Sequence, residues 1–223
     1  MEALLAFVAT LVSLRLSADL VRRHRRSPAP GLLAWAGALG AFAVGSGAIA
    51  WGSAAGWGNA DFRVYYLFGA LLAAALLGVG SLQRAGVRGV SAPTLVYVGL
   101  AIGVAIAVPL TMPVSGSSIP EAQAHLSLFP ARVLAIAANS LGTLAAVAVA
   151  ALGLRRRPLG NGLILAGLVV AAVGSALAGL GKAESALFTA AAALLLYAGF
   201  VVPTRSSAPS PDAHPGRRAG AAP

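Results

Sequence analysis

The sequence predicts an all-α polytopic membrane protein, a bundle of seven transmembrane helices with its N-terminus outside and its C-terminus inside. Three observations lead to this prediction: 58% of the 223 residues are hydrophobic, only 10% are charged, and the charges fall between long apolar runs. A typical soluble domain carries about 25% charged residues. Since much of a soluble globule must face water, we expect the lipid bilayer to be the solvent of this chain.

Seven apolar segments reach the length of about 20 residues that an α-helix needs to cross the hydrocarbon core. In chain order, we expect spans at 3–21, 31–54, 62–82, 93–112, 131–153, 160–179 and 185–202, which together form a transmembrane domain over 1–202. The first segment differs from a secretory signal, because its positive charges follow the apolar stretch. The composition then changes to Ser, Pro, Ala, Gly and Arg, so 203–223 is expected to be a disordered cytoplasmic tail.

Arginine clusters predict the direction in which these helices cross the membrane. With the N-terminus outside, twelve of the sixteen basic residues fall on the cytoplasmic side. The topology-setting arginines between the spans are Arg22, Arg23, Arg25, Arg26, Arg84, Arg88, Arg155, Arg156 and Arg157. Six or eight helices would place at least one cluster outside, so the same pattern favours seven. We therefore expect a multi-pass protein of a bacterial cytoplasmic (inner) membrane.

Aromatic residues give a second indication of the same topology. Trp51, Trp57, Tyr65 and Tyr66 all lie around the second expected loop. Trp and Tyr favour the membrane interface, where the ring contacts apolar chains and the polar tip meets water. The sequence thus predicts that these four side chains form part of an outer aromatic belt.

The longest external loop spans 113–130. Ser118 followed by Glu121 fits a capping box, and this pattern predicts a short interfacial helix at about 119–129. On such a helix Glu121 and His125 would share a face, but a zinc protease motif needs a second histidine and further ligands. We interpret this segment as an amphipathic loop that is exposed to water.

Polar residues inside the expected spans are the candidate functional residues, because ionisable and amide groups are costly in hydrocarbon. Arg15 and Asp19 lie four apart on the first span and are predicted to form an ion pair, either lining a cavity or near the headgroups. Asn139, Ser140 and Thr143 form the most polar patch of the fifth span. This patch predicts either a hydrogen bond between helices or a binding site.

Small residues four apart predict close helix packing. Examples are Gly99 with Gly103, and Gly174 with Ala178. In lipid no hydrophobic force drives helices together, and small residues let two backbones approach closely. These pairs predict a compact bundle and leave open a homo-oligomer.

No pattern for catalysis is found in the sequence. The absence of cysteine excludes disulfides and thiolate chemistry, and neither a phosphate-binding glycine loop nor a serine nucleophile elbow occurs. We expect no enzymatic activity, no cofactor and no metal. The net charge of +10 is not taken to indicate nucleic-acid binding, because the arginines cluster between apolar segments.

An Arg-rich first loop, Trp35 early in the second span, and the run Arg63-Val64-Tyr65-Tyr66-Leu67 opening the third resemble bacterial seven-span membrane proteins of uncharacterised function. These features are also loosely similar to the seven-helix sensor module that precedes some bacterial histidine kinases. This resemblance covers the first three spans. It implies signal reception without catalysis.

An offset of 129 residues superposes the second span on the sixth, and the matches of this offset are Gly31 with Gly160, Val44-Gly45-Ser46 with Val173-Gly174-Ser175, and Gly52 with Gly181. In this respect the chain resembles small sugar transporters built from two three-helix repeats joined by a fourth helix. The proline-glutamine pair typical of those transporters is missing.

These observations favour a non-enzymatic module that binds a ligand, a lipid or a partner protein, as a sensor or scaffold does. The alternative is a small-solute transporter or facilitator with a 3+1+3 helix arrangement. The expected partners are the lipid bilayer and either another membrane protein or a second copy of the chain.

Overall fold

The computed structural model describes residues 2–155, 157–179 and 185–202 of the chain, and these residues form helices and connections without a β-strand. The expected tail at 203–223 and Arg156 lie outside the described residues. The predicted all-α class is confirmed. The elements are α1 (Glu2–Arg26), α2 (Leu32–Ala55), α3 (Asn59–Tyr65), η1 (Tyr66–Ala73), α4 (Ala74–Arg84), α5 (Ser91–Ala107), α6 (Ala122–His125), η2 (Leu128–Arg132), α7 (Val133–Leu152), α8 (Pro158–Gly179) and α9 (Ser185–Val201).

Within the described part of the chain, four helices are long and apolar enough to cross a membrane. They are Glu2–Arg26, Leu32–Ala55, Asn59–Arg84 and Leu128–Leu152. The third of these combines α3, the π-helical η1 and α4 into one continuous rod. Three shorter apolar helical stretches follow the remaining predicted segments, at Ser91–Ala107, Pro158–Gly174 and Leu187–Val201.

One predicted segment is too long. The span expected at 93–112 ends at Ala107, because Val108 has an extended backbone with φ −71° and ψ 123°. Pro109 follows, and the residue before a proline is driven out of the helical region by the proline ring. The helix is therefore 17 residues long, at the short end of the range that can cross a bilayer.

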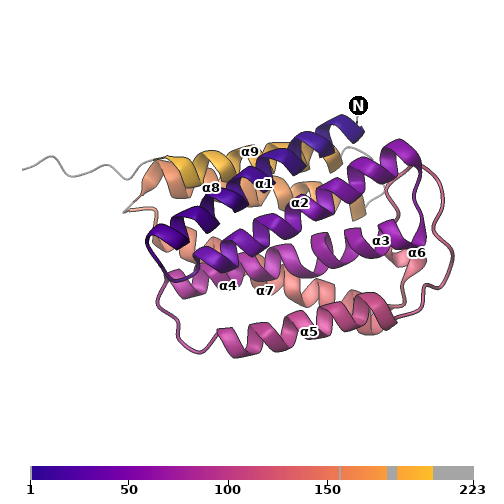
Figure 1. Cartoon of the computed structure of the whole chain (residues 1–223), viewed down its shortest axis with the longest axis horizontal. Helices are drawn as coiled ribbons and strands as arrows, with labels where there is room; N and C mark the ends of the chain where they lie inside the picture. The colour runs from indigo at the N-terminus through magenta and orange to yellow at the C-terminus, as the bar shows by residue number, and fades with distance from the viewer. Residues whose placement is uncertain (1, 156, 180–184, 203–223) are drawn as a thin grey trace, which may run out of the picture.

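The long helices lie side by side in a closed arrangement (Figure 1). α1 packs on α2, α2 on the rod that ends in α4, α4 on α7, α7 on α8, α8 on α9, and α9 packs back on α1. α5 lies at the edge of the bundle, where it contacts mainly η1. Of the four long helices α2 is the most deeply buried, so it forms the centre of the packing.

Glycines set the distance between several of these helices. A methyl group on Gly78 of α4 would lie 2.6 Å from the Cα atom of Gly142 on α7, and one on Gly142 would collide with the Ala74 carbonyl oxygen. A methyl group on Gly45 of α2 would lie 3.1 Å from the Cα atom of Gly69 in η1. At these points the backbones touch, as small residues in apolar bundles allow.

The pairs α2–α4 and α8–α9 also approach through glycines at their Arg-rich ends. A methyl group on Gly80 would lie 3.0 Å from the carbonyl oxygen of Gly31, and one on Gly199 would lie 2.8 Å from that of Gly160. Gly31 and Gly160 are the two residues that the 129-residue offset superposes. The partners of these two residues, Gly80 and Gly199, differ by 119 positions, so the two contacts are similar but follow different offsets on their two sides.

A second contact further along these helices repeats the correspondence. Gly45 approaches Gly69, and Gly174 of α8 approaches Phe188 of α9, where a methyl group on Gly174 would lie 2.5 Å from the phenylalanine Cβ atom. Gly45 and Gly174 again differ by the offset, and both contacts lie fourteen residues after the first along α2 and α8. Thus α2 with the rod that ends in α4, and α8 with α9, pack in the same register.

Gly99 and Gly103, for which the spacing predicts close packing, do not contact another helix of this chain. No atom lies within 4 Å of a methyl group placed on either residue. Both are exposed on α5, which has neighbours on its other face only. Spacing alone therefore does not identify which glycines mediate contact.

The loop before α7 is less helical than predicted. The helix expected at 119–129 is reduced to the four residues of α6, and Glu121 precedes it without capping it. The Glu121 carboxylate instead accepts a hydrogen bond of 2.8 Å from the Gln123 side chain. The loop is tied to the start of α3, because the Val114 N–H donates to the Asn59 side-chain oxygen at 2.8 Å.

Replacing Gly142 by alanine tests the contact between α4 and α7. We expect the free energy of unfolding to fall by about 1–3 kcal/mol, since the added methyl group overpacks the interface. Gly99→Ala is the matched control and should leave stability unchanged or raise it by up to about 1 kcal/mol, as alanine favours helix. Titration with sodium dodecyl sulfate in mixed micelles measures both. Equal effects of the two substitutions would contradict the packing.

Candidate functional site

The polar patch predicted on the fifth span lies beside the π-helical turn η1. The Asn139 side-chain amide donates a 2.7 Å hydrogen bond to the carbonyl oxygen of Ala70 in η1 and a 3.0 Å bond to Ala135 in its own helix. A π-helix shifts the backbone pairing to five residues, and side chains enter the hydrogen-bond ladder where it is irregular. Asn139 thus holds α7 against the rod from α3 to α4.

A second side chain binds the neighbouring carbonyl of the same turn. The Tyr97 hydroxyl of α5 donates to the Leu71 carbonyl oxygen at 2.5 Å. Two consecutive carbonyls of η1 are therefore each bonded by a side chain from a different helix. The π-helical turn is the point where α5, α7 and the third rod are joined by polar contacts.

The three predicted residues of the patch have different surroundings. Asn139 is partly buried and bonded to η1, Ser140 is exposed, and Thr143 is partly buried one turn further along α7. Next to them, Gly142 is buried against α4. Of the two interpretations that the sequence left open, the contacts match the hydrogen bond between helices.

The ion pair predicted between Arg15 and Asp19 is not formed. Asp19 instead accepts a 2.5 Å contact from Arg22, three residues further along α1, and Arg15 is exposed. The Arg22 side chain is 63% exposed and that of Asp19 is 30% exposed, so this pair lies near the surface and contributes little to stability.

The topology-setting arginines that the structure describes gather at one end of the bundle, which we call the basic end (Figure 1). The end of α1, the end of α4 and the α7–α8 connection meet there. The arginines placed at this end are Arg22, Arg23, Arg25, Arg26, Arg84, Arg88, Arg155 and Arg157. The helix directions thus bring together clusters that are far apart in sequence.

Arg84 is held at the basic end by an aromatic ring. Its guanidinium carbon lies 4.9 Å from the centroid of the Trp35 ring. Trp35 is fixed by a 3.2 Å hydrogen bond from its indole N–H to the Ser81 hydroxyl and by an edge-to-face contact of 4.6 Å with Phe200 of α9. The stack therefore orients a guanidinium from α4 on a ring from α2.

Arg157 lies close to this stack. Its guanidinium donates a 2.6 Å hydrogen bond to the Val202 carbonyl oxygen, just after the end of α9, where helix carbonyls lack partners. The charges of Arg157 and Arg84 are near enough to repel one another. Arg84 is exposed and Arg157 is partly exposed.

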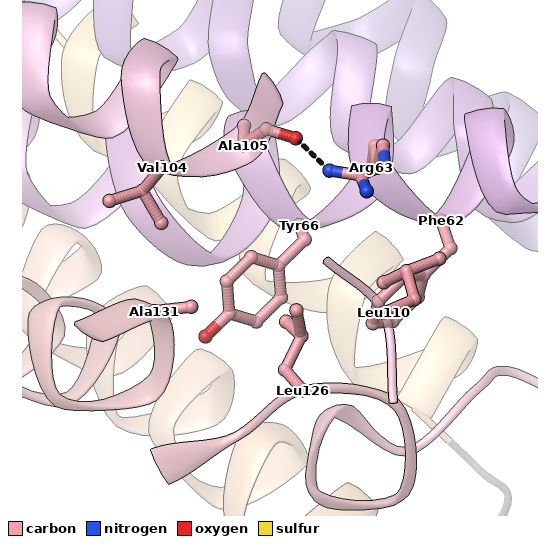
Figure 2. A pocket seen from close by; sticks show the side chains of 8 residues that line it. All are labelled: Phe62, Arg63, Tyr66, Val104, Ala105, Leu110, Leu126 and Ala131. Atoms are coloured by element: carbon pink, nitrogen blue, oxygen red, sulfur yellow. Dashed lines mark hydrogen bonds between the residues drawn. The ribbon is translucent and has the colours of Figure 1, made fainter. Parts of the chain in front are cut away.

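A small hollow lies at the opposite end of the bundle, between the rod, α5 and the long loop (Figure 2). Its lining is mostly apolar and consists of Phe62, Arg63, Tyr66, Val104, Ala105, Leu110, Leu126 and Ala131. The Tyr66 ring lies among these side chains. The cavity volume is about 10 Å³, which is about what one water molecule requires, so the hollow is too small for an organic ligand.

Arg63 closes one side of this hollow by capping α5. Its guanidinium donates to the carbonyl oxygens of Ala105 at 2.5 Å and Val108 at 2.9 Å (Figure 2 draws the first). The last carbonyls of a helix lack intrahelical partners and carry partial negative charge. The Arg63 guanidinium thus uses its hydrogen-bond donors to cap the end of α5.

The aromatic belt is only partly formed as predicted. Trp51 is 64% exposed, as a belt residue should be, but Trp57 is 4% exposed and Tyr66 is 5% exposed. Trp57 packs on Gly52 and meets the Tyr65 ring edge-on at 5.6 Å. Two of the four rings lie inward, where the loop 113–130 covers them, and the backbone N–H of Trp57 donates to the Gly116 carbonyl oxygen of this loop at 2.7 Å.

Glu121 and His125 are not brought together. Glu121 is bonded to Gln123, while the His125 ring lies 3.2 Å from the Met112 carbonyl oxygen and 5.5 Å from the Phe62 ring. In the part of the chain that the structure describes, no group of three His, Cys, Asp or Glu side chains is placed to hold a metal ion.

Three structural features are missing from the sequence-based prediction: the π-helical turn, the Tyr97 bond to it, and the stack of Arg84 on Trp35. A signal for the second existed, since a buried tyrosine hydroxyl in an apolar helix requires a partner. Trp35 was noted for its position, but no spacing rule links it to Arg84, 49 positions further along the chain. These contacts arise from tertiary packing.

No protein-family model matches the chain, and no curated protein and no solved structure gives a significant match.

Asn139→Ala tests the hydrogen bond to η1. We expect a loss of about 0.6–2 kcal/mol in the free energy of unfolding, in the range of hydrogen bonds between membrane helices. Amide exchange should also accelerate in 66–73. Ser140→Ala is the matched control on the exposed face of α7 and should change neither. If both variants behave like the unsubstituted protein, Asn139 does not hold the two helices together.

Proposed function

We propose that the chain is a seven-span protein of the cytoplasmic membrane that acts as a non-enzymatic module, binding a ligand, a lipid or a partner protein. Four long apolar helices and three shorter ones in one bundle support the span count. The N-terminus is proposed to lie outside, with the basic end facing the cytoplasm. The gathering of eight arginines at that end supports this orientation.

The observation that carries the binding function is how the interior polar groups are used. Asn139 and Tyr97 bond to carbonyl oxygens of η1, and next to them Gly78 touches Gly142. A route for a solute would need unoccupied polar groups around a water-filled space. The close contact between α4 and α7 leaves little room for a solute between these helices. It supports a module that binds partners at its ends and on its outer surface.

One observation favours a second candidate, a small-solute facilitator. α2 with the rod that ends in α4, and α8 with α9, pack in the same register, and α5 lies outside the ring of six helices. This arrangement resembles two three-helix repeats joined by a linking helix. The two candidates differ in whether a path through the bundle opens, which a flux measurement decides.

The topology is tested by reporter fusions at successive connections. An alkaline phosphatase fused after Arg26 should be inactive and a fluorescent protein at the same place should be bright, because this connection is proposed to lie inside. Fusions within 113–130 should give the opposite pair of results. An active phosphatase after Arg26 would overturn the orientation and the count of seven together.

Flux into proteoliposomes separates the two candidate functions. With the purified full chain reconstituted, we expect radiolabelled glucose and glycerol to enter no faster than into protein-free liposomes. The Gly142→Ala variant, which disturbs the α4–α7 contact, serves as the comparison for non-specific leakage. Uptake several times faster than in protein-free liposomes, and specific for one solute, would contradict the binding module and support the facilitator.

A further inference from the structure

We propose that Arg84 and Arg157 form a binding site for a phosphate group at the basic end of the bundle. This inference rests on the proposed function, because it names the ligand class that the membrane module would bind. Two kinds of ligand carry such a phosphate group: the headgroup of an anionic lipid, and free inorganic phosphate. The experiment below distinguishes them.

Both guanidiniums are held by contacts that leave them charged. Trp35 supports Arg84 by its ring face, and the Val202 carbonyl oxygen holds one amino group of Arg157. Neither contact neutralises the charge. A ring face and one carbonyl leave most of the N–H donors of the two side chains available, since a guanidinium carries five.

A carboxylate beside the two guanidiniums would neutralise part of their charge. Among the described residues the one ion pair is that of Arg22 with Asp19. The other described acidic residues are Glu2 at the start of α1, Asp61 in the first turn of α3, and Glu121 in the long loop, all at the opposite end. In the described part of the chain no carboxylate forms an ion pair with Arg84 or Arg157, and the two positive charges repel one another.

Two helices begin close to the pair. α2 begins at Leu32, beside Arg84, and its N-cap residue Gly31 offers no side-chain cap. Arg157 directly precedes α8, which begins at Pro158. The first N–H groups of a helix favour anions. Two helix starts and two guanidiniums thus contribute positive potential at one place.

These features select phosphate over a carboxylate side chain or a simple halide. A guanidinium binds two phosphate oxygens in a planar fork, and a phosphate group has enough oxygens to bridge two guanidiniums. Basic pockets between helices at a membrane surface are where lipid phosphates bind. An anion there would also offset the repulsion between Arg84 and Arg157, so binding should stabilise the fold.

The test measures thermal unfolding of the purified full chain in detergent with added lipid. We expect dioleoylphosphatidylglycerol to raise the melting temperature, and dioleoylphosphatidylcholine, with the same acyl chains and no net charge, to raise it less. Arg84→Gln and Arg157→Gln should each raise the half-saturating lipid concentration about tenfold or more, since each substitution removes charge-assisted hydrogen bonds to the phosphate. Titration with inorganic phosphate alone distinguishes the sources: equal stabilisation would indicate free phosphate, and none would indicate the lipid headgroup.

Arg88→Gln is the matched control, because Arg88 is exposed at the same end but is not part of the pair. It should leave the half-saturating concentration unchanged. Arg84→Lys keeps the positive charge and should preserve the packing of the helices. It should give a half-saturating concentration between those of the unsubstituted protein and Arg84→Gln, because lysine lacks the planar fork of N–H donors. Equal loss in the Arg84, Arg157 and Arg88 variants would indicate diffuse attraction and overturn the site. Full binding by both glutamine variants would overturn it as well.

The failure of this proposal and that of the proposed function are separable. If the fusions place the basic end outside the cell, the orientation fails whatever the lipid result. If the fusions agree and Arg84→Gln binds the lipid like the unsubstituted protein, only the phosphate site is wrong.

Discussion

Close approach through glycine is the constraint on which the rest of the structure depends. In an apolar solvent no hydrophobic force draws helices together, so packing and hydrogen bonds must do so. Gly78 and Gly142 bring α4 and α7 into backbone contact. This contact joins α1, α2 and the rod to α7, α8 and α9. The other interface that closes the ring lies between α1 and α9. Both interfaces place a helix of one half against a helix of the other.

The hydrogen bonds of the interior follow from this approach. With α7 close to the rod, the Asn139 amide reaches the Ala70 carbonyl oxygen of η1, and Tyr97 reaches that of Leu71 from the other side. A polar group in hydrocarbon must find a partner within the protein. The same principle explains Arg63, which caps α5. At the basic end Arg84 lies on the Trp35 ring and Arg157 donates to the Val202 carbonyl oxygen, and neither contact neutralises the charge of the guanidinium.

The sequence predicted the apolar helices well because length and hydropathy are local properties. The predicted end of one helix is wrong at 112, because Pro109 drives Val108 out of the helical conformation and the helix ends at Ala107. The site was predicted only in part. The amide of Asn139 was identified from its cost in hydrocarbon, but its partner is a carbonyl freed for bonding by a π-helical turn that apolar residues do not signal. Gly99 and Gly142 both lie within predicted spans, yet only Gly142 meets a neighbour, because contact is decided by the whole bundle.

The central claim is that the interior of the bundle is packed and closed to water. The chain has no cysteine, so a single introduced thiol reports on one position without background. Ser46, in the middle of α2, is 2% exposed, and cysteine is close to serine in size. We predict that Ser46→Cys stays unlabelled by a membrane-impermeant maleimide from either side of the membrane, while Ser117→Cys in the exposed loop is labelled from outside. Rapid labelling of Ser46→Cys would reveal a water-filled path and contradict the account.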